Sequence, residues 1–348
     1  MNILVLCGGL SNERDVSISS GTGVARALSA LGHSTVLADL YLGYPSNFSD
    51  PMEVFSRGSS LGDARIGDLS PDLARVKAMR PDSEVRIGPN ILTLCRAADI
   101  VFLALHGEEG ENGKLQALLD LYGVRYTGSG YLGSAAAMNK GISKALFRDA
   151  GIATPPGLLL SKDESPWGDV GFPCVVKPCS GGSSVGTSIV TSREQYLAAL
   201  ELAFQYEEKV IVERYIKGRE LTVGVMDGKA MPVIEIIPKA GFYDYKNKYQ
   251  SGATEEICPA RIGAEATARA QHIAEQVGKA LRIDVYYRVD LLWDTETDEF
   301  FCLEANTLPG MTPTSLIPQM AAAEGMSYGA LCEKIIEVSL KKYEASSH

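Results

Sequence analysis

The stretch "YYRVDLLWDTETDEFFCLEAN" at residues 286–306 consists of two apolar runs joined by the polar segment "DTETD". Two such runs around a short polar segment predict a β-hairpin. Strand side chains alternate between the two faces of a sheet, so Arg288 and Asp290 share one face, as Glu304 and Asn306 do. Strand pairing then places Asp290 opposite Glu304, within a residue or two. The hairpin therefore gathers two carboxylates and an amide.

This group of polar side chains has two explanations. Adjacent carboxylates repel each other unless a cation or a proton intervenes, and oxygen ligands of this kind suit Mg²⁺, which proteins hold with one or two carboxylates plus substrate phosphates. Alternatively, Arg288 forms a salt bridge with one carboxylate and Asn306 only caps the following loop. The hairpin alone does not decide between a metal site and an internal ion pair.

Composition narrows the class of protein. The chain has 348 residues, 45% apolar and 22% charged, which is typical of a soluble globular protein with two or three domains. Its net charge of -10 argues against a broad nucleic-acid or anionic-membrane surface. The seven cysteines include no CxxC pair, and the start "MNILVLCGGL" lacks the features of a signal peptide or membrane span. We therefore expect reduced thiols and a cytoplasmic location.

The first 128 residues favour one α/β domain. Short apolar runs at 2–9 and 98–107 predict buried strands, and a helical pattern at 20–31 separates the first of them from another strand at 33–40. This βαβ order predicts an open, mostly parallel sheet.

The rest of the chain predicts α+β structure, which we divide into 129–212 and 213–348. Residues 133–152 predict one helix ending at Gly151, with Lys140 in its middle. Asp227-Gly228 predicts a tight hairpin between two further strands.

The segment "VVKPCSGGSSVGTS" at 175–188 has the composition of a phosphate-binding loop. Lys177 stands at the end of a predicted strand, and glycines and serines follow it. Glycines let backbone N–H groups approach a phosphate closely, and a lysine adds a positive charge. The Walker pattern is missing, and a strand rather than a helix follows the loop. The alternative is an ordinary surface loop. Lys140, a second candidate phosphate ligand, is by itself more often a solvated lysine.

The segment "IVERYIKGRELTVGV" at 211–225 could contribute to a nucleotide pocket. Its strand carries Glu213, and a Lys217-Gly218 turn leads to Glu220. Such carboxylates can accept hydrogen bonds from an exocyclic amine or ribose hydroxyls. An edge strand with exposed acidic residues would give the same pattern.

Together, these segments resemble the D-alanine–D-alanine ligases of the ATP-grasp superfamily. The resemblance covers most of the chain, and the set of motifs is specific where each motif alone is not. The segments that carry it are "GGLSNERDVSISSG" (8–21), "LALHGEEGENG" (103–113), "MNKGISK" (138–144), "VVKPCSGGSSVG" (175–186), "ERYIKGRE" (213–220), "FYDYKNKY" (242–249), "RVDLL" (288–292) and "EANTLPGMTPTSLIP" (304–318). Asn112 and Tyr286-Tyr287 depart from the usual pattern, but none of the residues assigned to chemistry does.

The resemblance implies a fold and an activity. The fold would have three domains, with two α+β lobes sandwiching ATP beside the N-terminal α/β domain. The enzyme would join two D-alanine molecules, using ATP and two Mg²⁺ ions (Mn²⁺ can substitute) through a D-alanyl phosphate, for peptidoglycan synthesis. It would be a cytoplasmic homodimer that binds neither nucleic acid nor membrane.

The resemblance also implies roles for individual residues. The ATP-binding residues would be Lys140, Lys177, Ser183, Ser184, Glu213, Arg214, Tyr215, Ile216, Glu220 and Lys248. The metal ligands would be Asp290, Glu304 and Asn306. The first D-alanine would contact Glu13, His106 and Arg288, and the second would contact Ser315 and Leu316. Arg288 and the Gly310 N–H would hold the oxyanion of the tetrahedral intermediate, while Glu13, Ser183 and Tyr249 would form a link closed by a mobile lid at 239–252.

Several alternatives stay open at this stage. The lid carries "KY", whereas relatives that use D-lactate resemble a histidine-bearing lid, so D-alanine is favoured over D-lactate and, less firmly, over D-serine. Other candidates are another ATP-grasp ligase, a non-catalytic nucleotide sensor and a nicotinamide-dependent dehydrogenase. The last is weak because no GxGxxG motif follows the first strand.

Overall fold

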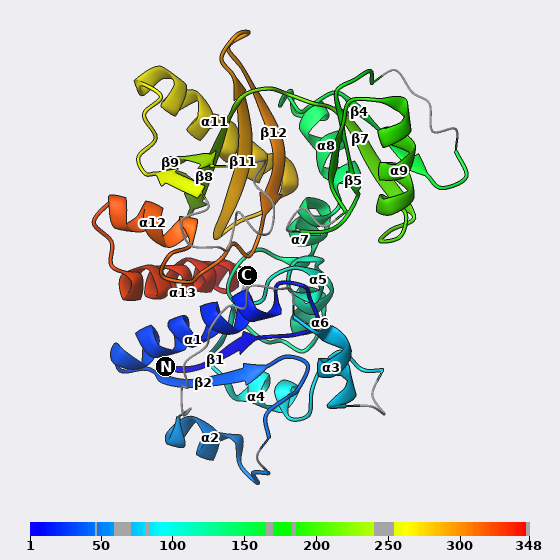
Figure 1. Cartoon of the computed structure of the whole chain (residues 1–348). Coiled ribbons are helices and arrows are strands. Elements are labelled where there is room, and N and C mark those ends of the chain that lie inside the picture. Colours follow the sequence, from blue (N-terminus) through cyan, green and yellow to red (C-terminus); the bar gives the residue numbers. More distant parts are fainter. Residues whose placement is uncertain are drawn as a thin grey trace.

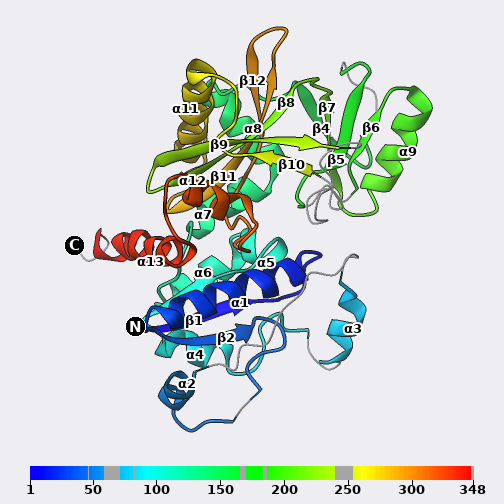
Figure 2. The same ribbon diagram turned by 60° about the vertical axis from the view of Figure 1, so that its left-hand side comes forward.

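The computed structural model describes residues 1–45, 47–58, 71–80, 84–164, 170–182, 186–239 and 254–345. Within these residues the strands form three sheets, of three, four and five strands. Figures 1 and 2 show the three-stranded sheet at the bottom, in blue and cyan, with the other two sheets beside each other above it. None of the described helices is long and apolar enough to cross a membrane.

The N-terminal sheet is parallel, as predicted. Its order is β2 (Ser34–Asp39), β1 (Asn2–Cys7) and β3 (Ile100–Leu103). All four residues of β3 are buried, as expected for a parallel sheet covered on both faces. The helices of this part of the chain are α1 (Arg14–Ala30), α2 (Pro51–Arg57), α3 (Leu73–Ala78), α4 (Ile91–Ala97), α5 (Glu108–Glu111) and α6 (Lys114–Leu121).

Helix α1 begins six residues before the predicted start at Ser20. The serines and glycines of its first turns weaken the helical pattern, but they pack closely against the sheet. A Cβ atom on Gly21 would lie 2.6 Å from the Cβ atom of Cys7. Small residues here bring the start of α1, and the loop before it, close to the ends of the strands.

The four-stranded sheet carries the glycine–serine loop. Its antiparallel order is β4 (Gly157–Ser161), β7 (Lys209–Arg214), β5 (Cys174–Pro178) and β6 (Ser188–Val190), with α9 (Arg193–Ala203) packed on β5 and β6. Strand β7 is therefore an interior strand, and the edge-strand alternative for Glu213 is wrong. The predicted domain boundary at residue 212 falls within β7, so we propose the division into three parts with this boundary after Arg214.

The five-stranded sheet contains both predicted hairpins. Its order is β10 (Thr254–Ile257), β9 (Lys229–Pro238), β8 (Arg219–Met226), β11 (Tyr286–Asp294) and β12 (Glu299–Asn306). Asp227 and Gly228 both have positive φ, as a type I′ turn requires. Asp290 pairs directly with Glu304, which confirms the predicted register.

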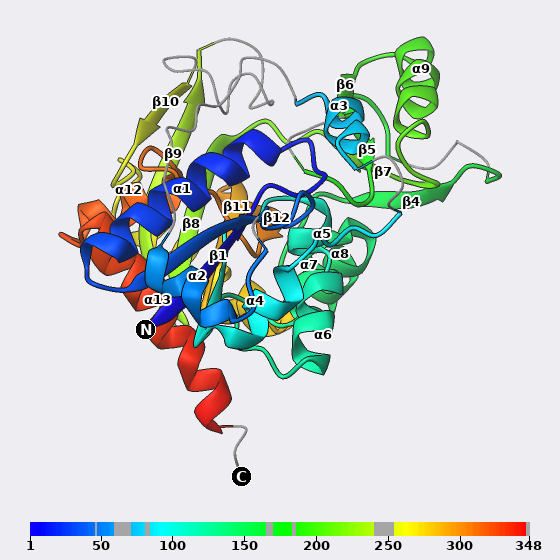
Figure 3. The same ribbon diagram turned by 90° about the horizontal axis from the view of Figure 1, so that it is seen from below.

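Three C-terminal helices complete the fold. Helix α11 (Ala264–Leu281) packs on β8, β9 and β11, and α12 (Leu316–Ala323) packs on β9. Helix α13 (Tyr328–Ala345) contacts both α12 and α1, and so joins the five-stranded sheet to the N-terminal part. Figure 3 shows α13, in red, running past the N-terminal sheet to the edge of the molecule.

The helix predicted over 133–152 is interrupted. It forms α7 (Tyr131–Met138) and α8 (Lys140–Asp149), separated by Asn139 in an extended conformation. The Asn139 side chain accepts a hydrogen bond from the Ile142 N–H and so caps α8. Lys140 is therefore the first residue of α8, not a residue in the middle of a helix, while Gly151 follows the helix end as predicted.

Candidate active site

Two neighbouring cavities lie where the three sheets meet. The larger, of about 490 Å³, lies between the four-stranded and five-stranded sheets. The smaller, of about 150 Å³, is lined by the loop before α1, the loop after β3 and the segment that follows β12. Lys140, Gly181, Gly182 and Glu304 line both cavities, so these residues form the boundary between them.

All predicted site residues that the structure describes line one of these cavities. Those around the larger cavity are Lys140, Lys177, Glu213, Arg214, Tyr215, Ile216, Glu220, Asp290 and Glu304. Those around the smaller cavity are Glu13, Lys140, His106, Arg288, Glu304, Asn306, Gly310, Ser315 and Leu316. The predictions for Ser183, Ser184, Lys248 and Tyr249 fall outside the described residues, as does the predicted lid after Lys239.

The β11–β12 hairpin places its polar side chains at this boundary. Asp290 accepts hydrogen bonds from Arg288 (2.9 Å to each oxygen), from the Asn306 amide (3.1 Å) and from the Thr222 hydroxyl (2.7 Å). Four donors thus use the acceptor sites of a carboxylate that is only 8% exposed. The salt-bridge alternative for Arg288 is present in the structure, but the set of oxygen ligands also fits Mg²⁺.

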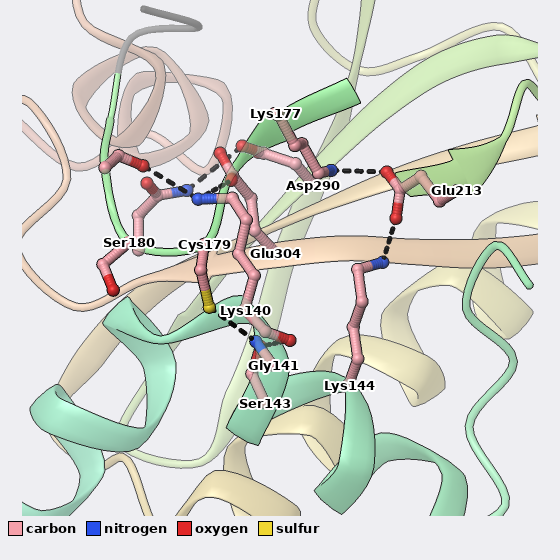
Figure 4. Close-up of polar contacts among 12 residues, drawn as sticks. Lys140, Gly141, Ser143, Lys144, Lys177, Cys179, Ser180, Glu213, Asp290 and Glu304 are labelled. Carbon is pink, nitrogen blue, oxygen red and sulfur yellow. Dashed lines mark hydrogen bonds and ion pairs between the residues drawn. The ribbon is translucent and has the colours of Figure 1, made fainter. Parts of the chain in front are cut away.

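Lys140 neutralises the charge of Glu304, the second carboxylate of the hairpin. Its Nζ atom lies 3.2 Å from Glu304 (Figure 4). The same atom donates to the carbonyl of Gly181 at 2.8 Å. Burial acts to lower the pKa of Lys140, but the charge and hydrogen bond of Glu304, together with the charges of Cys179 and Glu213, outweigh it and raise the pKa above its usual value. Lys140 therefore stays charged at neutral pH, and its 7% exposure excludes the solvated-lysine alternative.

Glu213 is held between two lysines at the side of the larger cavity. One of its carboxylate oxygens pairs with Lys177, and the other lies 2.7 Å from Lys144 (Figure 4). Lys144 also donates to Thr154 at 2.6 Å. Burial acts to raise the pKa of Glu213, but Lys177 and Lys144 outweigh it and lower the pKa. A charged Glu213 that is 2% exposed thus fixes the position of Lys177.

Lys144 is a site residue that our sequence analysis missed. It lies one turn after Lys140 on the same face of α8. Lys144 lines neither cavity, but it contacts Glu213, which lines the larger one. This i, i+4 spacing was the available signal. The ion pair between Lys144 and Glu213 could not be inferred from the sequence, because the two residues are far apart along the chain. Burial lowers the pKa of Lys144.

The resemblance to ATP-grasp ligases implies that Glu213 binds the nucleotide. We therefore expect Lys144→Met to weaken nucleotide binding about tenfold, because Glu213 loses one of the two cations that orient it. Calorimetric titration with ADP measures this affinity. The exposed Lys279, which lines neither cavity, provides the matched control Lys279→Met. Unchanged ADP affinity in Lys144→Met would contradict the assignment.

Glu13 reaches the smaller cavity between two glycines. Its carboxylate lies so close to Gly182 that a Cβ atom there would stand 2.8 Å from Oε2, and a Cβ atom on Gly107 would stand 3.0 Å from it. The loop before α1, the loop after β3 and the glycine–serine loop therefore meet at this carboxylate. A side chain at Gly182 would displace it.

His106 lies at the end of the predicted strand and is 5% exposed. Its Nδ1 atom is 2.9 Å from the carbonyl of Leu308, and its Nε2 atom is 3.0 Å from the hydroxyl of Ser20. Burial lowers the pKa of His106, which favours the neutral imidazole. His106 thus lines the cavity while both ring nitrogens bind other parts of the protein.

Comparison with known proteins gives consistent matches. The family model for the D-ala D-ala ligase N-terminus matches residues 2–129, and the model for the C-terminus matches residues 146–337. The D-alanine–D-alanine ligase of Lacticaseibacillus casei (strain BL23) is 42% identical over 347 residues, covering 99% of this chain and 97% of that protein. The one from Halalkalibacterium halodurans is 38% identical over 350 residues, covering 98% and 100%.

Solved structures agree with these matches. The D-alanine–D-alanine ligase from Bacillus anthracis complexed with ATP superimposes with a TM-score of 0.77 at 31% identity, covering 100% of both chains. The VanG D-Ala:D-Ser ligase from Enterococcus faecalis gives a TM-score of 0.75 at 27% identity, covering 97% of this chain and 99% of that one.

Proposed function

Because this chain belongs to the D-alanine–D-alanine ligase family and is an ATP-dependent enzyme that joins two D-alanine molecules, we propose that its two cavities divide the substrates between them. The larger cavity takes ATP, and the smaller cavity takes the amino acids. The observation that carries this proposal is their shared boundary at Lys140 and Glu304. The γ-phosphate and the carboxylate that it activates must meet at such a boundary.

The larger cavity offers suitable partners for each part of ATP. Tyr215 and Ile216 provide apolar surface for the adenine, with Arg214 beside them, and Glu220 provides an acceptor for ribose hydroxyls. Lys140 lies at the boundary and Lys177 lines the larger cavity, and both bind the phosphates as point charges. Ser183, Ser184 and Lys248 complete our proposed ATP set.

The hairpin supplies the proposed metal ligands. Asp290, Glu304 and Asn306 offer oxygen atoms on paired strands, next to the cations Arg288 and Lys140. When bound, Mg²⁺ (or Mn²⁺) would neutralise charge on the ATP phosphates. For this, Asp290 must give up hydrogen bonds from Arg288 and Asn306, which frees Arg288 toward the smaller cavity that it lines.

The chemistry then proceeds in two steps. A carboxylate oxygen of the first D-alanine attacks the γ-phosphorus, ADP leaves, and a D-alanyl phosphate forms. The amine of the second D-alanine attacks the carbonyl carbon, phosphate leaves, and the amine loses a proton. Glu13 holds the ammonium of the first D-alanine, and Arg288 with the Gly310 N–H stabilises the oxyanion.

The second D-alanine needs a site near the carbonyl carbon. Ser315 and Leu316 line the smaller cavity at the start of α12, where they provide a hydroxyl and apolar surface. We propose them as its binding residues. Ser183 and Tyr249 complete the proposed catalytic set, as the family resemblance implies.

We propose three further properties. The dipeptide serves peptidoglycan synthesis, the protein acts in the cytoplasm, and two copies form a homodimer. All seven cysteines are free in the structure, which is consistent with a reducing compartment. The contacting helices α6 and α7 carry, on or next to them, four exposed large apolar residues: Leu121, Tyr122, Tyr131 and Leu132. This exposed apolar surface supports a contact with a second copy of the chain there.

Phosphate release from ATP tests the proposed function. Release that requires both Mg²⁺ and D-alanine, with D-alanyl-D-alanine as product, supports it. L-alanine, D-lactate and D-serine are the comparison substrates, and the VanG neighbour makes D-serine the most informative of them. Equal turnover with D-serine would contradict D-alanine as the preferred second substrate.

A further inference from the structure

The segment Thr307–Met311 follows β12, and its first four residues, Thr307 to Gly310, line the smaller cavity. It includes Gly310, whose N–H is the proposed oxyanion donor. A backbone donor has no rotamer of its own, so its direction depends entirely on how the chain around it is held. The contacts of this segment therefore bear directly on catalysis.

Leu308 is held on both sides of its backbone. Its N–H donates to Oε1 of Glu111 at 3.2 Å, and its carbonyl lies 2.9 Å from Nδ1 of His106. The other oxygen of Glu111 accepts from the Gly107 N–H at 2.7 Å. One carboxylate thus ties the loop after β3 to the segment after β12.

Met311 is also held on both sides. Its N–H donates to the Ser20 hydroxyl at 3.2 Å, and the Tyr328 hydroxyl donates to its carbonyl. Gly310 lies between Leu308 and Met311, so four side chains from three other parts of the chain fix the peptides around it. A carbonyl can only accept, so Nδ1 of His106 carries the proton and Nε2 accepts from Ser20.

We infer that Glu111 is a positioning residue, which acts with His106 and Ser20 to hold the segment Thr307–Met311 so that the Gly310 N–H points at the oxyanion. This inference rests on the proposed function of Gly310. It gives Glu111, which our sequence analysis did not assign, a role in the second chemical step rather than in ATP binding.

The electrostatics around Glu111 are consistent with this role. Burial and then the charge of Glu13 raise its pKa to about 7, against the opposing effects of the two backbone N–H groups and Arg288. The buried hydroxyl of Tyr286 and the neutral His106 are the other titratable groups nearby. Binding of a substrate ammonium to Glu13 would remove one cause of the raised pKa, and a charged Glu111 accepts from both N–H groups.

Glu111→Gln is a nearly isosteric test. Both partners of Glu111 are N–H donors, so either orientation of the amide sets its NH₂ group against a backbone N–H. Two rates are measured separately in the full-length enzyme. Positional isotope exchange in ¹⁸O-labelled ATP, with D-alanine present, reports the reversible first step, and D-alanyl-D-alanine formation reports both steps.

We expect Glu111→Gln to lower kcat for the dipeptide about 10- to 100-fold. Isotope exchange and KM for ATP should stay within about threefold of their original values, and the ionisation near pH 7 should disappear from the pH profile of kcat. Glu108→Gln, an exposed position on the same helix, is the matched control with unchanged rates. If Glu111→Gln is unstable in a thermal melt, Ser20→Ala replaces it and should give the same split.

Three outcomes would overturn the inference. They are an unchanged kcat, an equal loss of isotope exchange and dipeptide formation, and a raised KM for D-alanine with unchanged kcat, which would indicate direct substrate contact. Failure of the proposed function is distinguishable, because the unsubstituted enzyme would then form no D-alanyl-D-alanine from ATP and D-alanine.

Discussion

Glu304→Gln is expected to lower kcat by about 10³-fold and to raise the Mg²⁺ concentration needed for half-maximal activity. The amide keeps the shape of the side chain but removes the charge that faces Lys140 and pairs across the hairpin with Asp290. A neutral oxygen holds Mg²⁺ more weakly than a carboxylate does. Steady-state rates over a Mg²⁺ titration measure both effects.

The same strand provides the control for this prediction. Glu299 is exposed at the far end of β12, so Glu299→Gln makes the same chemical change away from both cavities. Its Mg²⁺ titration should match that of the unsubstituted enzyme. If the Glu304→Gln titration matched it as well, the hairpin would not be the metal site.

Lys140→Met is expected to lower kcat by about 10²- to 10³-fold and to raise KM for ATP. Lys140 lies at the boundary of the two cavities, and its raised pKa keeps it charged where negative charge moves from ATP to the acyl phosphate. Methionine retains the apolar stem but not the charge. The substitution also leaves Glu304 without this partner, so Mg²⁺ affinity should increase rather than fall.

This opposite effect on Mg²⁺ separates the charge of Lys140 from general damage to the site. Misfolding or loss of the loop would weaken nucleotide and metal binding together. Lys334→Met, on α13 and away from both cavities, is the control for the loss of a lysine. A Lys140→Met enzyme with normal kcat would show that this charge does not contribute to phosphoryl transfer.

Sequence patterns predicted the parts of the site that lie close together along the chain. The register of Asp290 and Glu304 followed from strand alternation and the length of the connecting turn, because a one-residue slip would move every side chain to the other face. The parallel N-terminal sheet followed in the same way from short buried runs separated by a helix.

Contacts between distant segments were beyond such patterns. The break at Asn139 depends on its capping side chain and on a β-bridge to Ser180. Local helix propensity contains neither contact, so the sequence predicted one continuous helix through this position. Lys144 and Glu111 look like ordinary charged residues of amphipathic helices. Their partners, Glu213 and Leu308, are 69 and 197 positions away, so only the folded chain shows their roles.

The most direct test of the account is a crystal structure with ADP, Mg²⁺ and a phosphorylated phosphinate that mimics the tetrahedral species. We expect Mg²⁺ within about 2.1 Å of oxygen atoms from Asp290, Glu304 and Asn306, with the phosphinate oxygen bonded to Arg288 and the Gly310 N–H. Mg²⁺ bound away from these three side chains, or a phosphinate outside the smaller cavity, would contradict the proposal that ATP and D-alanine meet at this hairpin.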